Sequence, residues 1–402
     1  MNIKIIPGTA RGAVTVPSSK SYAHRMTLAA ALSAGETHMG NITFCDDIDA
    51  TMDCVRALGT GCEAGESSIN IKGTAGRFNT EATLNCRESG STLRFMIPVV
   101  LINKGTYHFT GTKRLFERGV EVYEEALSPT GISFKKTDDG LIISGELKSG
   151  EYILPGNVSS QYISGLLFAL PVLEGDSLIK VLPPVESRRY IDITIEVLRT
   201  FGVNVTEDHP NEFSIKGSQT YKALNCQAEG DWSNAAFLYG LQMVGGDFEI
   251  KGLNPDSIQG DKVFPELMKA LENPEKPIDI SACPDLGPIL FAAAAFKNGG
   301  TFTGTRRLRI KESDRAAAMA EELSKFGIAV DVHEDSVVVH PGTLKKPEKI
   351  LSGHNDHRIV MSLAVLCTVT GGIIEGAEAV NKSFPGFFSV LESLGVEVIY
   401  DI

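Results

Sequence analysis

The sequence predicts an α/β protein of two similar domains, built from six copies of one small structural unit. The chain has 402 residues. A single hydrophobic core rarely supports a chain of this length, which suits two domains of about 200 residues. An apolar, helix-like run that begins at a polar cluster and ends against a glycine recurs six times. Short segments typical of strands precede most of these runs.

The six apolar runs share a common beginning and a common end. They cover residues 19–34, 89–104, 159–174, 231–244, 285–298 and 355–370. The glycines that close them are Gly35, Gly105, Gly175, Gly245, Gly299 and Gly371, at intervals of 70, 70, 70, 54 and 72 residues. A period this regular indicates that one fold unit is repeated along the chain.

A second amphipathic run follows each first run after an extended segment. These second runs tend to end in an apolar residue and a glycine, as at Phe201-Gly202 and Phe326-Gly327, which is a C-cap signal. Segments 3–16, 69–84, 141–154, 213–224 and 337–350 each read as strand, turn and strand. The unit is therefore β-β-α-β-α, and we expect the short fourth copy to lack most of its late strands.

Composition excludes several classes of protein. The net charge is −12, whereas proteins that bind nucleic acid or anionic membranes are usually basic, so we expect neither partner. The longest apolar runs, near 166–173 and 289–296, are far shorter than the roughly 20 residues of a membrane span, and the apolar stretch in residues 1–8 is too short for a signal peptide. Seven cysteines without a CxxC pair argue against disulfides and zinc ribbons, and favour a reducing cytoplasm.

The starts of the first runs are the candidate binding site. They carry Lys20-Ser21, Ser89-Gly90-Ser91, Ser159-Ser160-Gln161, Asp231, Asp285 and Asn355-Asp356-His357-Arg358. A helix N-terminus has free N–H groups and about half a positive charge, so it attracts anions. Six equivalent starts, several with an added cation, predict a shared site for polyanionic ligands. The alternative is a stacked scaffold without chemistry, whose charged helix ends are simply solvated.

Two of the motifs place cations in unusual positions. Lys20 stands at a helix start, where a cation is unfavourable unless an anion faces it. Arg25 follows Ser21 by four residues, so the two side chains lie on the same face of the predicted helix. If residues 309–315 are helical, Lys311 and Arg315 share a face and Glu312 points elsewhere; a surface salt-bridge ladder is the alternative.

Two clusters could suggest a metal ion. His354 and His357 are three residues apart, and Asp46-Asp47-Ile48-Asp49 is acidic. The histidines lack an HExxH pattern or a cysteine partner, and carboxylates at a helix start are favoured by the helix dipole. We therefore expect no metal and no cofactor.

Together these segments resemble the EPSP synthase (3-phosphoshikimate 1-carboxyvinyltransferase) family of enolpyruvyl transferases over essentially the whole chain. The matching motifs are Ser19-Lys20-Ser21 with Arg25, Ser159-Ser160-Gln161, Ser187 with Tyr190-Ile191-Asp192-Ile193-Thr194, Glu229-Gly230-Asp231, Gln259-Gly260-Asp261, Pro284-Asp285, Lys311-Glu312-Ser313-Asp314-Arg315, Asn355-Asp356-His357-Arg358 and Lys382-Ser383-Phe384-Pro385. Each motif alone is weak, but the ordered set is specific.

The resemblance implies a fold and a domain division. Two similar domains, each of three βαβαββ units around parallel helices, would form an inverse α/β barrel. Residues 1–18 with 230–402 would make the first domain and residues 19–229 the second, with the active site in the cleft between them. The resemblance further implies a cytoplasmic enzyme, and we expect a monomer.

The implied reaction transfers the enolpyruvyl (1-carboxyvinyl) group of phosphoenolpyruvate to the 5-hydroxyl of shikimate 3-phosphate. Phosphate is released, in the shikimate pathway to chorismate and the aromatic amino acids. Asp285 would take the hydroxyl proton, and Lys20 and Glu312 are candidates for proton transfer at the methylene carbon, which makes these three the implied catalytic residues. The implied shikimate 3-phosphate contacts are Lys20, Ser21, Arg25, Ser159, Ser160, Gln161, Ser187, Asp285 and Lys311. The implied phosphoenolpyruvate contacts are Lys20, Gly90, Arg118, Gln161, Arg315, Arg358 and Lys382.

Several positions depart from the family's pattern, namely Ser18, Glu88, Ser89, Phe95 and Arg307.

A second hypothesis is a UDP-N-acetylglucosamine enolpyruvyl transferase, which has the same fold and cosubstrate. Members of that family usually carry a cysteine in a mobile loop of the second repeat, and residues 110–120 contain none. A third hypothesis is a non-catalytic repeat protein that binds anions and does not need Asp285 and Glu312.

Overall fold

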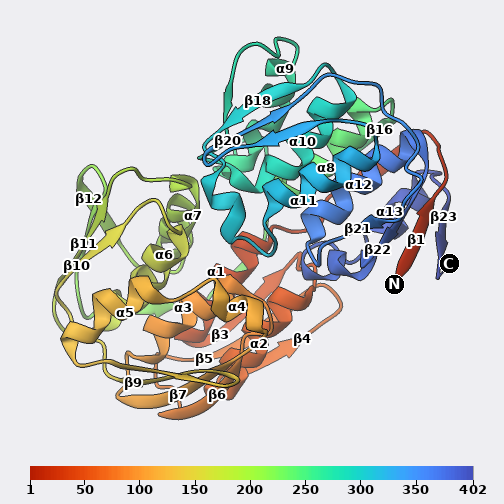
Figure 1. The fold of residues 1–402 in the computed structure, drawn as a ribbon. Coiled ribbons are helices and arrows are strands. Elements are labelled where there is room, and N and C mark those ends of the chain that lie inside the picture. The colour runs from red at the N-terminus through yellow and green to blue at the C-terminus, as the bar shows by residue number, and fades with distance from the viewer. Residues whose placement is uncertain (402) are drawn as a thin grey trace. The chain divides into compact units, whose positions relative to one another are not determined.

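The computed structural model describes residues 1–401, and the chain forms two compact units. Unit 1 comprises Met1–Pro17 and Gly230–Ile402, and unit 2 comprises Ser18–Glu229. The chain therefore leaves unit 1 once and returns to it once. Figure 1 shows the N-terminal strand of unit 1 beside strands from the C-terminal end of the chain.

Unit 1 contains three sheets. The first has the order β21 (Leu351–Ser352), β22 (Gly372–Glu375), β1 (Asn2–Ile5) and β23 (Val398–Tyr400). The second pairs β16 (Asp247–Lys251) with β2 (Arg11–Thr15). The third has the order β17 (Ile278–Asp279), β18 (Gly300–Thr303), β20 (Ser336–Val339) and β19 (Val330–Val332).

Unit 2 also contains three sheets. One has the order β14 (Tyr221–Lys222), β3 (Ser33–Gly40), β5 (Ile69–Thr74) and β4 (Gly61–Ala64), and β15 (Asn225–Gln227) also pairs with β3. Another has the order β6 (Glu81–Asn85), β7 (Gly105–Thr110), β9 (Gly140–Gly145) and β8 (Ser133–Thr137). The last has the order β10 (Glu151–Pro155), β11 (Ser177–Leu182), β13 (Glu212–Ile215) and β12 (Val205–His209).

Five of these sheets share one pairing pattern. In each, the first two strands of the order run parallel and the next two pairings are antiparallel. The sixth sheet keeps only the parallel pair of β16 and β2. It belongs to the short fourth repeat, so the predicted loss of its late strands is confirmed.

The helices fall into the two predicted sets. The first-run helices are α1 (Lys20–Leu32), α3 (Gly90–Val100), α6 (Ser160–Ala169), α8 (Trp232–Met243), α10 (Gly287–Phe296) and α12 (His357–Thr370). The second-run helices are α2 (Asp46–Ala57), α4 (Lys113–Glu117), α5 (Glu121–Leu127), α7 (Arg188–Thr200), α9 (Phe264–Ala270), α11 (Arg315–Lys325) and α13 (Phe387–Ser393). Short 3-10 turns lie at η1 (Ser128–Thr130), η2 (Leu170–Val172), η3 (Gly260–Val263), η4 (Pro284–Leu286), η5 (Arg306–Ile310) and η6 (Ala377–Lys382).

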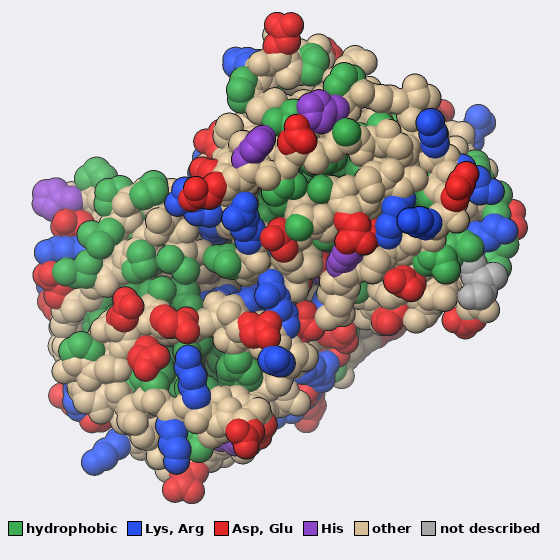
Figure 2. All heavy atoms as spheres, viewed as in Figure 1, with side chains coloured by type: hydrophobic (Ala, Val, Ile, Leu, Met, Phe, Trp, Pro, Cys, Tyr) green, Lys and Arg blue, Asp and Glu red, His purple; other side chains and the backbone are tan. Residues whose placement is uncertain are grey.

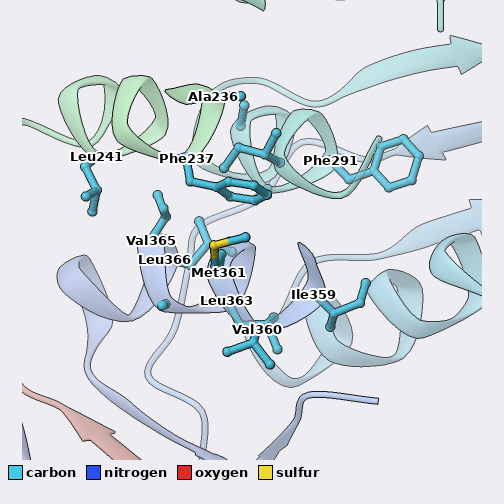
Figure 3. Packing of buried hydrophobic residues seen from close by; sticks show 14 of the residues in the cluster. Ala236, Phe237, Leu241, Phe291, Ile359, Val360, Met361, Leu363, Val365 and Leu366 are labelled. Carbon is cyan, nitrogen blue, oxygen red and sulfur yellow. The ribbon is translucent and has the colours of Figure 1, made fainter. Parts of the chain in front are cut away.

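The first-run helices are buried on nearly every side. All residues of α10 except Phe296 are buried, as are the first twelve of α12. A helix that is apolar all round belongs in the middle of a core, and the alanines of α10 let neighbours approach closely. Figure 3 shows Phe237 and Leu241 of α8 packed against Met361 and Val365 of α12. This packing holds the N-termini of α8, α10 and α12 in one region of unit 1.

The second-run helices are amphipathic and cover the outside. They end as predicted, since Gly202 and Gly327 follow the C-caps of α7 and α11 with φ of 82° and 82°. A side chain would strain the backbone at these two positions. Among the described helices, none is long and apolar enough to cross a membrane. On the face drawn in Figure 2, acidic and basic side chains are interspersed.

We predict that Phe291→Ala destabilises unit 1 strongly. Phe291 of α10 is fully buried and meets the ring of Phe302 edge-on at 5.0 Å between centroids. Removing a buried phenyl ring leaves a cavity, so the free energy of unfolding should fall by about 3–5 kcal/mol. Urea unfolding measures this change. Ile399→Ala, at a residue that is 37% exposed on β23, is the control and should change stability little. Equal losses in both variants would contradict the proposed core.

Candidate functional site

In unit 1, one carboxylate gathers three cations where α10 begins. Asp285 lies in the η4 turn before α10. Its carboxylate oxygens accept from Arg315 Nη1 at 2.8 Å and Arg358 Nη2 at 3.2 Å, and Lys311 Nζ lies at 3.1 Å. Arg358 also donates to the Asp285 carbonyl at 3.2 Å. Residues from two of the predicted helix starts, Asp285 and Arg358, therefore meet Lys311 and Arg315 of the 309–315 motif.

Arg315 is the centre of this cluster. Its side chain is 1% exposed, and its guanidinium contacts three carboxylates. Nε donates to Asp356 Oδ2 at 2.8 Å, Nη2 to Glu312 Oε2 at 2.7 Å, and Nη1 to Asp285. Asp356 is fully buried and also caps α12, because Oδ1 accepts from the Arg358 N–H at 2.9 Å. The planar guanidinium thus fixes the starts of α10, α11 and α12 relative to one another.

The segment 309–315 is only partly helical, so the condition under which Lys311 and Arg315 would share a helix face is not met. Residues 309–315 do not form a single helix, because η5 ends at Ile310, Lys311 is extended and α11 begins at Arg315 with Asp314 as its N-cap. The Asp314 side chain accepts from Ala317 N at 3.1 Å, which starts the helix late. As a result Glu312 turns back toward Arg315 rather than away from it.

Burial and charge set the protonation of this cluster. Burial raises the pKa of Asp285, but Arg358, Lys311 and Arg315 outweigh it and hold that pKa well below its usual range. Burial lowers the pKa of Lys311 to about 8, with Arg307 and Arg315 adding to the effect and Asp285 opposing it. Burial raises the pKa of Asp356 too, yet the Arg315 guanidinium brings it below the usual value.

Two more cations lie next to the cluster. Lys382, the last residue of η6, donates from Nζ to the Asn355 carbonyl at 2.5 Å. Arg307 is buried in η5 and acts electrostatically on Lys311. Five cations thus stand near the carboxylates of Asp285, Glu312 and Asp356 in this part of unit 1, and such a gathering of cations suits an anionic ligand.

A fourth carboxyl group, Asp261, differs from the others. It is buried in η3, and its oxygen accepts from the Ser233 hydroxyl. Burial, together with the charge of Asp285, raises its pKa to about 6, although Arg358 opposes the shift. The motif Gln259-Gly260-Asp261 is one of those that carry the family resemblance, but no role was assigned to it. Its position could therefore be recognised from the sequence, whereas the raised pKa of Asp261 could not.

In unit 2, Arg25 is held by neutral groups only. Its guanidinium donates to Thr194 Oγ1 at 2.7 Å, the Tyr190 carbonyl at 3.0 Å and the Ser21 carbonyl at 2.8 Å. Its Cζ also lies 5.0 Å from the centre of the Phe95 ring. Burial lowers the pKa of Arg25 to about 10. Because these partners carry no negative charge, the positive charge of Arg25 stays available to an anion.

Lys20 lies at a helix start, as predicted, and Ser187 also precedes a helix. Lys20 is the first residue of α1, and its Nζ donates to Asp47 Oδ2 at 2.7 Å. Asp47 stands in the acidic first turn of α2, which confirms the dipole interpretation of the 46–49 cluster. Ser187 precedes α7 with a left-handed backbone, φ 55°, and is buried.

Gln161 is fixed at both ends of its amide. Its Oε1 accepts from Arg94 Nη1 at 2.7 Å, and its Nε2 donates to Ser91 Oγ at 2.9 Å. Ser159 caps α6 by accepting from Gln161 N at 3.3 Å, and Ser160 is buried in the first turn. These contacts hold the start of α6 against the start of α3.

Gly90 stands where two guanidinium groups converge. A Cβ atom at Gly90 would lie 2.8 Å from Arg118 Nη2 and 2.9 Å from Arg94 Nη1. Ser89 caps α3 by accepting from Thr92 N at 3.2 Å. The absence of a side chain at Gly90 therefore leaves its backbone open beside two cations, a favourable place for an anion.

Some residues of the site were not assigned from the sequence. Arg94 is buried, lies over the Tyr162 ring and donates to the carbonyl oxygens of Arg118 and Gly119. Asp356 was recognised within a motif but given no contact. Sequence spacing could have suggested Arg94, which lies one helical turn after Gly90 on the same face.

The described residues contain one group with metal-like spacing. Ligand atoms of Glu321, Glu322 and His354 lie within 4.8 Å of one another. Lys325 Nζ already donates to Glu322 Oε1 at 2.8 Å, so an ammonium neutralises the buried carboxylate. His357, the other predicted histidine, is not part of the group.

Comparison with known proteins identifies the family. The model of EPSP synthase (3-phosphoshikimate 1-carboxyvinyltransferase) matches residues 6–391. The chain belongs to the EPSP synthase family. Membership decides between the two enolpyruvyl transferases considered from the sequence, and it makes the chain an enzyme rather than a passive anion-binding repeat.

Relatives and solved structures agree with this assignment. A 3-phosphoshikimate 1-carboxyvinyltransferase of Clostridium kluyveri is 41% identical over 98% of each chain. One from Clostridioides difficile is 39% identical over 98% of this chain and 97% of its own. An EPSP synthase structure from Acinetobacter baumannii has a TM-score of 0.80 at 26% identity, covering 99% of both chains. The enolpyruvyl transferase NikO of Streptomyces tendae shares the fold, with a TM-score of 0.75 at 14% identity over 99% of this chain and 98% of its own. The predicted inverse α/β barrel is therefore confirmed.

We predict that anion binding weakens as pH rises through the titration of Lys311. The pKa of Lys311 is lowered to about 8, so the ammonium is protonated below that pH and neutral above it. For sulfate, whose own charge is constant here, Kd should rise about tenfold between about pH 7 and 9. Calorimetric titration measures this dependence. Lys311→Arg stays charged and should flatten the curve; an unchanged slope in that variant would exclude Lys311 as the cause.

Proposed function

We propose that this chain transfers the enolpyruvyl group of phosphoenolpyruvate to the 5-hydroxyl of shikimate 3-phosphate, releasing phosphate. This would be a step in the synthesis of chorismate and the aromatic amino acids. The observation that carries the proposal is Asp285, an ionised carboxylate in contact with three cations, in a chain of the EPSP synthase family.

Both substrates are anions, and the proposed contacts supply matching cations and donors. For shikimate 3-phosphate they are Lys20, Ser21, Arg25, Ser159, Ser160, Gln161, Ser187, Asp285 and Lys311. For phosphoenolpyruvate they are Lys20, Gly90, Arg118, Gln161, Arg315, Arg358 and Lys382. Arg25, Arg315 and Arg358 are held by their neighbours in fixed geometry, which lowers the entropy lost when a phosphate or carboxylate binds. Each unit contributes part of each set, so we propose that both units serve one reaction.

Asp285 is the proposed base for the 5-hydroxyl. Without substrates, its three cations keep its pKa well below the usual range, which makes it a weak base. The phosphate and carboxylate groups of the substrates would compete for Arg358, Lys311 and Arg315. As those cations turn to the substrates, the proton affinity of Asp285 rises toward that needed for general base catalysis. Substrate binding would thus make Asp285 a stronger base.

The reaction then proceeds by addition and elimination. A proton is added to the methylene carbon of phosphoenolpyruvate, and the 5-oxygen bonds to the adjacent carbon, giving a tetrahedral intermediate. The carbon–oxygen bond to phosphate breaks, and a proton leaves the methyl group to restore the double bond. Lys20 and Glu312 are the proposed groups for these proton transfers. An ammonium can donate a proton, whereas the Glu312 carboxylate accepts a hydrogen bond from Arg315, so we assign donation to Lys20.

Further proposals concern the setting of the enzyme. We propose that the two compact units are the two domains of the family's fold, and that the enzyme acts as a monomer in the cytoplasm. The cysteine pattern supports a reducing compartment, since all seven cysteines are unpaired thiols in the described part of the chain. The proposed reaction needs no metal and no cofactor.

The direct test is phosphate release from phosphoenolpyruvate in the presence of excess chelator. We expect release with shikimate 3-phosphate and none with UDP-N-acetylglucosamine. Release only with the nucleotide sugar would replace the acceptor, and no release with either would refute the proposed activity. Loss of release caused by the chelator would contradict metal independence.

We predict that Asp285→Ala separates binding from turnover. Removing the carboxylate should lower kcat by about 100- to 10,000-fold, because the hydroxyl proton loses its acceptor. Binding of phosphoenolpyruvate should stay within a few-fold, since the three cations remain. Phosphate release and calorimetry measure the two effects. The matched control Asp331→Ala removes an exposed carboxylate paired with His340 and should leave both unchanged. Normal turnover in Asp285→Ala would exclude this base.

A further inference from the structure

A strained dipeptide lies directly before the start of α12. His354 and Asn355 both have left-handed backbones, with φ of 47° and 52°. Any residue other than glycine adopts this conformation at a cost in free energy, although asparagine and histidine accept it more readily than most. Two such residues in succession persist only where surrounding contacts hold them, so the contacts of His354 require an explanation.

The dipeptide positions three groups of the proposed site. The Asn355 carbonyl accepts from Lys382 Nζ at 2.5 Å. The next residue, Asp356, accepts from Arg315 Nε at 2.8 Å and from the Arg358 N–H at 2.9 Å. A change in the backbone at residues 354 and 355 would therefore displace the groups assigned to phosphoenolpyruvate.

A buried carboxylate holds the dipeptide from the other side. The Glu322 side chain is 0% exposed, and its Oε1 lies 2.9 Å from His354 Nε2. Its Oε2 accepts from Ser352 N at 3.0 Å, and Lys325 Nζ donates to Oε1 at 2.8 Å. Glu322 stands seven residues after Arg315, two turns along the same face of α11. One face of α11 thus contacts the segment before α12 at two points. Glu322 meets His354, and Arg315 meets Asp356.

We propose that Glu322 and His354 are positioning residues for the phosphoenolpyruvate groups of unit 1, and that protonation of His354 adjusts their affinity. This Glu322–His354 pair touches no reacting atom. It acts through the backbone at residues 354–356. This segment carries the Asn355 carbonyl, which accepts from Lys382, and the Asp356 carboxylate, which accepts from Arg315. The inference rests on the proposed function for the identity of the ligand.

The charges around His354 determine the direction of the pH effect. The facing groups are Glu322, Glu321 and Lys325, all on α11. The hydrogen bond with Glu322 raises the pKa of His354 above its ordinary value, although burial opposes this. A raised folded-state pKa means that the charged pair is complete below the ordinary histidine value and weakens as pH rises through the raised value. The neutral ring can still donate from Nε2, so the pair weakens without breaking.

Three variants separate the contribution of the hydrogen bond from that of the charge. His354→Gln keeps a donor that does not titrate, His354→Ala removes the donor, and Glu322→Gln removes the charge. His340→Ala is the matched control, because His340 forms a histidine–carboxylate pair with Asp331 at 2.7 Å elsewhere in unit 1. Phosphate release between about pH 5.5 and 8.5 gives KM for each substrate and kcat. NMR titration of the His354 ring gives its protonation directly.

We expect His354→Ala to raise KM for phosphoenolpyruvate by about 3- to 30-fold, with a smaller change in KM for shikimate 3-phosphate. His354→Gln should keep KM near the wild-type value at neutral pH and lose the inflection that follows His354 titration. Glu322→Gln should bring the ring's titration back toward ordinary histidine. His340→Ala should change none of these values.

Several outcomes would overturn the inference. They are an unchanged KM in His354→Ala, equal changes for both substrates that follow a loss of thermal stability, or a wild-type pH profile in His354→Gln. Zinc binding by the wild type that Glu322→Gln abolishes would make the cluster a metal site instead. If Glu322→Gln fails to fold, the His354 variants still decide. If the wild type releases no phosphate, the proposed function fails, and calorimetric binding of phosphoenolpyruvate to the same variants still tests the positioning.

Discussion

The structure of unit 1 depends on the buried guanidinium of Arg315. It meets Asp285, Glu312 and Asp356 at once, and these residues stand at or near the starts of α10, α11 and α12. Desolvating charges is costly, and a buried ion pair is weak evidence for stability. Removing Arg315, however, would leave three neighbouring carboxylates without their shared cation. The value of the arrangement is geometric: three helix starts cannot shift independently while one planar cation joins them.

Unit 2 holds its buried guanidinium groups in place without carboxylates. Arg25 and Arg94 are buried with hydroxyl, carbonyl and amide acceptors rather than carboxylates. Neutral acceptors fix the direction of a guanidinium without cancelling its charge. Unit 1 therefore holds carboxylates and cations in mutual contact around Asp285, whereas unit 2 holds guanidinium groups whose neutral partners do not cancel their charge. Proton transfer needs the first kind of environment, and anion binding needs the second.

The repeat explains how these residues come together. A parallel pair of strands and the helix between them place a helix N-terminus at the same point of most repeats, so residues about 70 positions apart become equivalent. The fourth repeat lacks its antiparallel strands and keeps only β16 and β2. Its helix, α8, still has an aspartate N-cap, Asp231, which shows that the parallel core of the repeat is sufficient to present a helix start.

The sequence by itself determined the architecture and the position of most site residues along it. Six apolar runs, their closing glycines and the motifs at their starts follow from periodicity and capping, which are local properties of the chain. Tertiary structure alone decided the contacts: that Glu312 turns toward Arg315, that Arg94 orients Gln161, and that Glu322 reaches His354 thirty-two residues away. These depend on where α11 begins and on which buried groups become neighbours. Distances between segments, and the burial that sets pKa values, arise only when the repeats pack, so no spacing along the chain could have given them.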